Sequence, residues 1–128
     1  MENNDNHFLG LRTVGYAVND LQKARDWYAD VLGFPPYFDE PFYVGFNVGG
    51  YELGIMPAEG VNQPSGGGVL AYWGVANAEA AFARLLEKGA KEREPVTEVG
   101  GGIKVATVFD PFGNVLGVIE NPHFEVKK

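Results

Sequence analysis

The side chains that could carry acid–base or ligand chemistry are few in this sequence. It contains no cysteine, and its two histidines, His7 and His123, lie near the two ends of the chain. Disulfide bonds and thiolate catalysis are therefore excluded, and no Ser-His-Asp or Cys-His arrangement can be recognised. The lack of cysteine also fits a reducing compartment.

Glu52 is the carboxylate in the most informative position. It precedes Gly54 by two residues, so on a strand both would point to the same face of the sheet. If that face lines a cleft, partial burial raises the pKa of Glu52 and prepares a general base. Alternatively, Glu52 is a surface carboxylate, solvated or paired with a Lys or Arg. Tyr72 shares the face of Leu70 and would bring a hydroxyl to the same cavity, which makes it the second acid–base candidate.

The elements that must position these residues occur twice in the chain. Residues 46–55 align without gaps on residues 109–118, an offset of 63, and both segments end in Leu-Gly followed by Ile or Val. Residues 13–18 and 70–75 form a second pair at an offset of 57. The chain is therefore two copies of one strand–helix–strands unit. We place the first module at about residues 9–57, a loop at 58–68 and the second module at 69–121.

Local patterns predict the elements of each copy. Bulky Val14, Tyr16 and Val18 alternate with small residues, which predicts a strand over residues 11–18. Asn19 or Asp20 can cap a helix that runs to Leu32, and Asn77 can cap a second one over residues 78–88. Further strands are predicted at 42–48, 51–56, 69–75, 103–109 and 114–120.

Three motifs, in this order, carry a resemblance to a known family. Val18-Asn19-Asp20-Leu21 and Leu32-Gly33-Phe34 open the first module, and Asp110-Pro111-Phe112-Gly113-Asn114 precedes the last strand. With Trp27-Tyr28 between the first two, the chain resembles the vicinal oxygen chelate superfamily over residues 11–120. That superfamily includes glyoxalase I, extradiol dioxygenases and bleomycin resistance proteins. The resemblance implies a single α+β domain of two tandem βαβββ modules, forming a curled mixed sheet around a central cleft, and a homodimer.

The resemblance also implies where a metal would bind. The four equivalent positions lie on the first and last strand of each module, and here they are Thr13, Gly54, Leu70 and Gly117. Leu and Gly have no ligating side chain, and a lone Thr hydroxyl is a poor ligand. His7 and His123 are each six residues from the nearest of these positions, ~20 Å along an extended strand. We therefore expect no metal and no cofactor.

The predicted cleft is instead defined by small residues and aromatic rings. An apolar, aromatic pocket with few polar groups suits a planar or amphipathic small molecule. Phe46 and Phe109 lie near enough in the motif to line it as well, although each aromatic could equally be a core residue. The predicted cleft residues are Thr13, Gly15, Phe38, Tyr43, Glu52, Gly54, Leu70, Tyr72 and Gly117.

Charge and hydropathy limit the partners. With 17 acidic against 10 basic residues, the net charge of −7 opposes binding to a nucleic-acid backbone. No apolar run approaches the ~20 residues that a membrane span needs. The first residues are acidic and polar, unlike a signal peptide, so we expect a cytoplasmic protein.

Two functions remain open. The first is a glyoxalase/bleomycin resistance-like protein whose metal-free cleft binds a small aromatic or amphipathic molecule without transforming it. The second is a lyase, isomerase or dioxygenase of the superfamily that uses a relocated metal or acid–base chemistry of Glu52 and Tyr72. The lack of metal-ligating side chains at the four expected positions favours the first function.

Overall fold

The computed structural model describes residue 7 and residues 11–60, 62–65 and 70–123. The first module contains β1 (Thr13–Val18), α1 (Leu21–Leu32), β2 (Phe38–Glu40), β3 (Tyr43–Val48) and β4 (Tyr51–Pro57). The second contains β5 (Tyr72–Gly74), α2 (Ala78–Glu87), β6 (Lys91–Glu98), β7 (Lys104–Phe109) and β8 (Val115–Glu120). The predicted module starts, near residue 9 and at residue 69, and positions 61 and 66–68 of the predicted loop lie outside the described residues.

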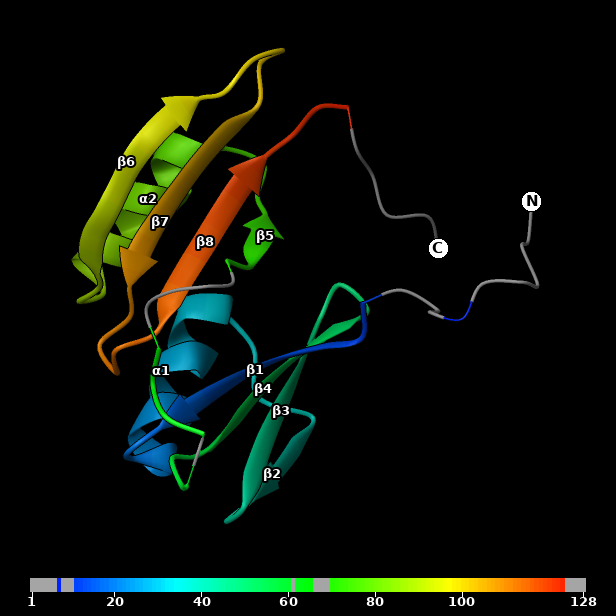
Figure 1. The fold of residues 1–128 in the computed structure, drawn as a ribbon, viewed down its shortest axis with the longest axis vertical. Coiled ribbons are helices and arrows are strands. Elements are labelled where there is room, and N and C mark those ends of the chain that lie inside the picture. Colours follow the sequence, from blue (N-terminus) through cyan, green and yellow to red (C-terminus); the bar gives the residue numbers. More distant parts are fainter. Residues whose placement is uncertain (1–6, 8–10, 61, 66–69, 124–128) are drawn as a thin grey trace.

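Each module folds into its own four-stranded mixed sheet. The strand orders are β1-β4-β3-β2 and β5-β8-β7-β6. In each sheet the first strand pairs with the last in parallel, and the remaining pairs are antiparallel. Figure 1 shows the two modules one above the other, with α2 packed on one face of the upper sheet. The predicted α+β fold of two βαβββ modules is confirmed.

The helices begin and end where the sequence predicts. Asp20 caps α1, because its Oδ1 accepts a hydrogen bond from the Lys23 amide at 3.1 Å. Gly33 ends α1 with a φ of 90°, a left-handed conformation that favours glycine. Asn77 caps α2 by accepting from the Ala80 amide at 2.9 Å. Neither helix is long and apolar enough to cross a membrane, within the part of the chain that is described.

The outermost strands, β2 and β6, are absent from the sequence-based prediction. The residues of β2 are all exposed, and most of those of β6 are too. These strands have one neighbour each, so little of their surface is buried and no apolar alternation marks them. Pro95 lies within β6, where an edge strand tolerates its missing amide.

The strand register supports the repeat but corrects one part of it. Gly15 lies opposite Gly54 in β1–β4, and Tyr72 lies opposite Gly117 in β5–β8, so the offsets of 57 and 63 hold for these strands. The strands before the last turn, β3 and β7, have a different offset. Gly45 of β3 pairs with Gly54, whereas Thr107 of β7 pairs with Gly117. The β3–β7 offset is therefore 62, because the second turn has one extra residue.

This insertion places two similar phenylalanines on opposite faces. Phe46 is fully buried, with 0% of its side chain exposed, whereas Phe109 is 38% exposed. The gapless alignment of Phe46 with Phe109 is thus wrong, and Phe46 belongs to the core rather than to the cleft.

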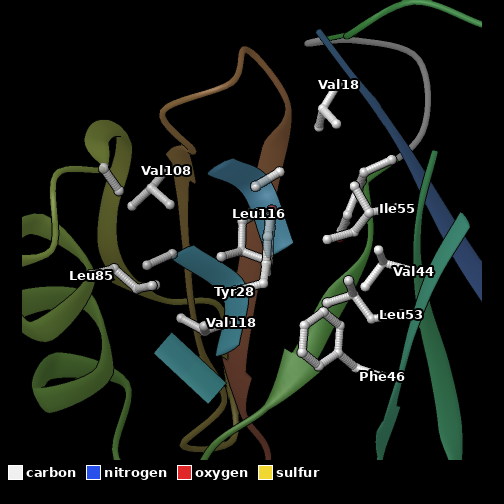
Figure 2. Packing of buried hydrophobic residues seen from close by; sticks show 14 residues of the cluster. Val18, Tyr28, Val44, Phe46, Leu53, Ile55, Leu85, Val108, Leu116 and Val118 are labelled. Atoms are coloured by element: carbon white, nitrogen blue, oxygen red, sulfur yellow. The ribbon is translucent and has the colours of Figure 1, made fainter. Parts of the chain in front are cut away.

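One hydrophobic core serves both modules. Figure 2 shows residues of both sheets facing each other across Tyr28 of α1; they include Val18, Phe46, Leu53, Ile55, Val108, Leu116 and Val118, and Leu85 of α2 joins them. Hydrogen bonds also join the modules. The Tyr28 hydroxyl donates to Asp110 Oδ2 at 2.6 Å, and Asn114 Nδ2 donates to the Ala17 carbonyl at 2.9 Å. The shared core fixes the relative position of the two sheets.

Candidate functional site

The first sheet has one face packed into the core and one face turned away from it. Val14, Tyr16 and Val18 of β1 belong to the core or pack against it. Because side chains alternate along a strand, the residues between them lie on the other face. We call this second surface the open face, defined by Thr13, Gly15, Ala17, Phe38, Tyr43, Gly45, Glu52, Gly54 and Met56.

Glu52 lies at the centre of a hydrogen-bonded cluster on the open face. Thr13 is its register partner on β1, and the Thr13 Oγ1 donates to Glu52 Oε1 at 2.8 Å. The Tyr37 hydroxyl donates to Glu52 Oε2, and the Tyr43 hydroxyl also hydrogen bonds to the carboxylate. We call Glu52, Thr13, Tyr37 and Tyr43 the Glu52 cluster. Three strands and the segment before β2 converge in it.

The cluster stabilises the charged form of Glu52. The hydrogen bond from Tyr37 lowers its pKa most, those from Thr13 and Tyr43 lower it further, and desolvation opposes them. Burial thus acts on the pKa of Glu52 in the expected direction, but the donors outweigh it, and the net shift is opposite to the one that prepares a general base. Burial and the neighbouring carboxylate together raise the pKa of Tyr43 to about 12. At neutral pH the cluster is a carboxylate held by neutral hydroxyls.

The glycines of the open face accommodate side chains of the protein itself. A Cβ on Gly54 would collide with the Tyr43 hydroxyl, and a Cβ on Gly45 would lie 2.6 Å from Glu52 Oε2. A Cβ on Gly15 would lie 2.9 Å from Met56 Cε. These three glycines face one another across β1, β4 and β3. The expected empty space at Gly54 is therefore filled by the Tyr43 ring.

Gly117 is filled in the same way in the second module. A Cβ there would lie 2.6 Å from the Ala71 carbonyl oxygen and 2.8 Å from Tyr72 Cδ1. The expectation of an open cleft over Gly117 is wrong, because Tyr72 already covers it. Both predicted glycines thus make room for a tyrosine ring.

Four aromatic rings form a partly exposed patch that shares Tyr37 and Tyr43 with the Glu52 cluster. Phe38 lies at its centre, with ring centroids 6.4 Å from Tyr37, 6.1 Å from Phe42 and 6.2 Å from Tyr43. The exposed fractions are 64% for Tyr37, 38% for Phe38 and 66% for Phe42. We call these four residues the aromatic patch. It combines apolar surface with the hydroxyls that hold Glu52.

Sequence reasoning identified Phe38, Tyr43, Glu52 and Thr13 but missed Tyr37 and Phe42. Tyr37 follows Pro35-Pro36 and reads as part of the helix exit, and Phe42 reads as the first residue of a strand. The high number of aromatic residues in this segment could have indicated the aromatic patch. Residues 34–43 contain five of them, Phe34, Tyr37, Phe38, Phe42 and Tyr43, in ten positions.

The predicted residues of the second module do not join the Glu52 cluster. Leu70 precedes β5 and is partly exposed, and the Tyr72 ring lies over Gly117. Among the described residues, the hydroxyls that bind Glu52 are those of Thr13, Tyr37 and Tyr43. The structure therefore brings Glu52 together with other tyrosines rather than with Tyr72.

A cavity of about 350 Å³ continues the open face toward the second module. Gly15, Ala17 and Met56 line it from the first sheet, so it begins next to the row of three glycines. Polar groups come from the opposite side, where Asn114 precedes β8 and Asn62, Gln63 and Ser65 lie in the connecting segment. The cavity therefore offers a mixed polar and apolar space beside the predicted residue Gly15.

The donor groups do not fit a catalytic divalent metal. Such a metal needs about three His, Cys or carboxylate ligands. The described part of the chain contains no group of three such residues that could hold an ion. His7 is exposed, and His123 Nε2 hydrogen bonds to the Gly101 carbonyl at 2.7 Å. Of the described residues, Glu52 alone remains near the predicted positions, and one carboxylate falls short of the ligands that such a metal needs.

The chain was compared with known families and structures. A family model described as the Glyoxalase/Bleomycin resistance protein/Dioxygenase superfamily matches residues 6–118. A glyoxalase-related enzyme from Fulvimarina pelagi is 17% identical, with a TM-score of 0.78 and 94% of each chain covered. A member of that superfamily from Sphaerobacter thermophilus DSM 20745 is 21% identical, with a TM-score of 0.72, 89% of this chain and 98% of that chain covered.

A third solved structure is a glyoxalase/bleomycin resistance protein from Catenulispora acidiphila DSM 44928. It is 23% identical, with a TM-score of 0.65, and the alignment covers 88% of this chain and all 100% of that chain. At such identities these neighbours share the fold. No curated protein matches the chain.

Proposed function

Because the chain belongs to the Glyoxalase/Bleomycin resistance protein/Dioxygenase superfamily, we propose that it is a binding protein of that group. Its ligand is a small aromatic or amphipathic molecule, which it holds on the open face without a divalent metal and without transforming it. The superfamily fold occurs in both enzymes and binding proteins, so the two functions have to be distinguished from the residues of the site.

The observation that carries this proposal is the aromatic patch beside the Glu52 cluster. Tyr37 and Phe42 expose about two thirds of their side chains, and Phe38 joins them to Tyr43. Exposed aromatic rings with a few oriented polar groups suit a planar or amphipathic ligand. The neighbouring cavity of about 350 Å³ is large enough for part of such a molecule.

The enzymatic alternative has less support. A general base works best with a pKa near neutrality, whereas hydrogen bonds from Tyr37, Thr13 and Tyr43 lower the pKa of Glu52. Tyr72 contacts Gly117 rather than Glu52. With no donor set for a metal in the described residues, neither predicted route to catalysis has its groups assembled.

Equilibrium dialysis against planar aromatic compounds, with acridone as the first probe, tests the proposal. We expect saturable binding that survives EDTA and is weakened up to about tenfold by Phe38→Ala, since stacking on one ring contributes roughly 0.5–1.5 kcal/mol. Val99→Ala is the matched control, because Val99 is a 60% exposed apolar residue of the second module. Loss of binding in EDTA, or equal weakening by both variants, would contradict the proposal.

We also propose that the protein is a cytoplasmic homodimer. The resemblance to the superfamily supports the dimer, and the absence of cysteine supports a reducing compartment. Light scattering at micromolar concentration should give twice the mass of one chain, and a mass of one chain would contradict the dimer.

A further inference from the structure

We propose that the ligand of the open face is a cation, a molecule whose aromatic part lies on the aromatic patch and whose protonated amine binds the Glu52 carboxylate. The inference rests on the proposed function above, and it adds the charge and the anchoring group of the ligand.

The first support is the uncompensated charge of Glu52. Its hydrogen-bond partners are Thr13, Tyr37 and Tyr43, all neutral donors. Ion pairs elsewhere in the described residues neutralise other carboxylates, but none of them includes Glu52; they are Arg25–Asp26, Arg25–Asp39, Lys88–Asp30, Arg93–Glu94 and Lys104–Glu79. The hydroxyls thus hold a negative charge in place without cancelling it.

The second support is the direction of the hydrogen bonds. The Tyr37 hydroxyl donates its single proton to Glu52, so the lone pairs that remain on its oxygen can only accept. The carboxylate itself is also an acceptor. A protonated amine, which carries only donors, matches such a set of oxygens, whereas a carboxylate or phosphate group would meet repulsion.

The third support is the aromatic surface around the carboxylate. Tyr37 and Tyr43 contact Glu52 through their hydroxyls, and Phe38 packs beside both rings. The faces of aromatic rings attract cations within ≈ 6 Å of the ring centroid, and the attraction grows as water is excluded. A carboxylate and several exposed rings in one place therefore favour an organic cation over an inorganic one.

The charge of the whole chain acts in the same direction. A net charge of −7 attracts cations toward the protein and repels anions before any contact is made. This long-range field raises the association rate, while the Glu52 cluster determines where the cation is held.

Three tricyclic probes of similar shape and different charge test the inference. At pH 7, 9-aminoacridine is a cation, acridone is neutral and acridine-9-carboxylate is an anion. Equilibrium dialysis should show the cation bound about tenfold or more tightly than acridone, and the anion bound most weakly. Glu52→Gln should reduce the preference for 9-aminoacridine over acridone about tenfold, as expected for the loss of one charge pair in a partly exposed site.

Glu87→Gln is the control for total charge, because Glu87 is an exposed residue at the end of α2 in the other module. Thermal unfolding checks that Glu52→Gln is still folded. If neither acridone nor 9-aminoacridine binds the unaltered protein, the proposed function itself fails. If both bind equally, or if Glu52→Gln and Glu87→Gln weaken the cation equally, the cationic ligand is wrong while the aromatic binding site stands.

Discussion

The two modules have the same strand pairing, yet they carry different polar groups on the sheet face turned away from the core. Glu52 binds neutral hydroxyl groups in the first, whereas in the second Thr107 hydrogen bonds with Glu94 and Arg93, which form an ion pair. Thr13 pairs with Glu52 in the first sheet, and by the same register Leu70 and Val115 take these places in the second. Positions that build the core remain apolar in both, such as Leu53 of β4 and its repeat equivalent Leu116 of β8. A repeated fold thus retains its packing residues, while the residues of the open face differ from one copy to the other.

The modules also differ in how a tyrosine covers the glycine of the last strand. In the first, the flexible Tyr43 side chain lies over Gly54. In the second, the backbone carbonyl of Ala71 approaches Gly117 together with the Tyr72 ring. A side chain can rotate away from a new methyl group, whereas a backbone carbonyl cannot move without disturbing its strand. The first glycine therefore tolerates change better than the second.

Alanine at Gly117 should give the largest effect, and alanine at Gly54 is the comparison for it. We expect Gly117→Ala to lower the free energy of unfolding by about 3 kcal/mol and Gly54→Ala by about 1 kcal/mol, through overpacking against a fixed and a movable neighbour. Gly74→Ala is the control, because nothing lies within 4 Å of its Cβ position. Urea denaturation measures all three. Equal losses for Gly117→Ala and Gly54→Ala would contradict the distinction between the modules.

The hydrogen bond between the modules should give the next largest effect. Tyr28→Phe removes the donor to the buried Asp110 carboxylate, a bond of 2.6 Å. We expect a loss of about 2 kcal/mol in the free energy of unfolding, as for a hydrogen bond to a charged group. Tyr51→Phe, on the partly buried start of β4, controls for removal of a tyrosine hydroxyl. A loss no larger than that of the control would show that this hydrogen bond does not help to hold the modules together.

Glu52 and Asp110 should respond to acid in opposite ways. Hydrogen bonds, that from Tyr37 above all, lower the pKa of Glu52 in the folded state, so its contribution to stability is complete above its unfolded pKa and is lost as the pH falls through the folded value. Burial raises the pKa of Asp110, so its contribution is complete below its unfolded pKa and is lost as the pH rises through the folded value.

Denaturation of the unaltered protein, Glu52→Gln and Asp110→Asn between about pH 3 and pH 6 checks these signs. Relative to Glu52→Gln, the unaltered protein should become less stable toward pH 3, by less than about 1 kcal/mol because Glu52 is partly exposed. Relative to Asp110→Asn, it should become more stable toward pH 3. Parallel pH profiles for the protein and both variants would contradict the assigned shifts.

Glu52→Val introduces the residue type found at the equivalent position of the second module, Val115. It should have the smallest effect on stability. We expect a change within about 1 kcal/mol, because Glu52 is partly exposed and its partners can turn to water. Binding of 9-aminoacridine should nevertheless fall about tenfold or more. Thermal unfolding and dialysis on the same samples measure both. A stability loss above about 3 kcal/mol would identify the Glu52 cluster as structural.

Much of the fold could be predicted from local sequence. The capping residues Asp20 and Asn77 and the alternation on β1 depend on spacing within a few residues, and the internal repeat follows from a direct match of residue types; the structure has the corresponding elements. The polar edge strands β2 and β6 could not be predicted, because pairing with one neighbour holds them and little of their surface is buried.

The sequence by itself determined the two modules, the faces of their inner strands and the lack of ligands at the expected metal positions, since these follow from residue type and period. Only the tertiary structure decided what surrounds Glu52. Its donors Thr13, Tyr37 and Tyr43 lie up to 39 residues away along the chain and meet it through strand register. Register and the turn from α1 into β2 also place tyrosine rings over glycines that appear empty in the sequence. A pKa depends on such neighbours, so its direction at Glu52 could be found only in the folded chain.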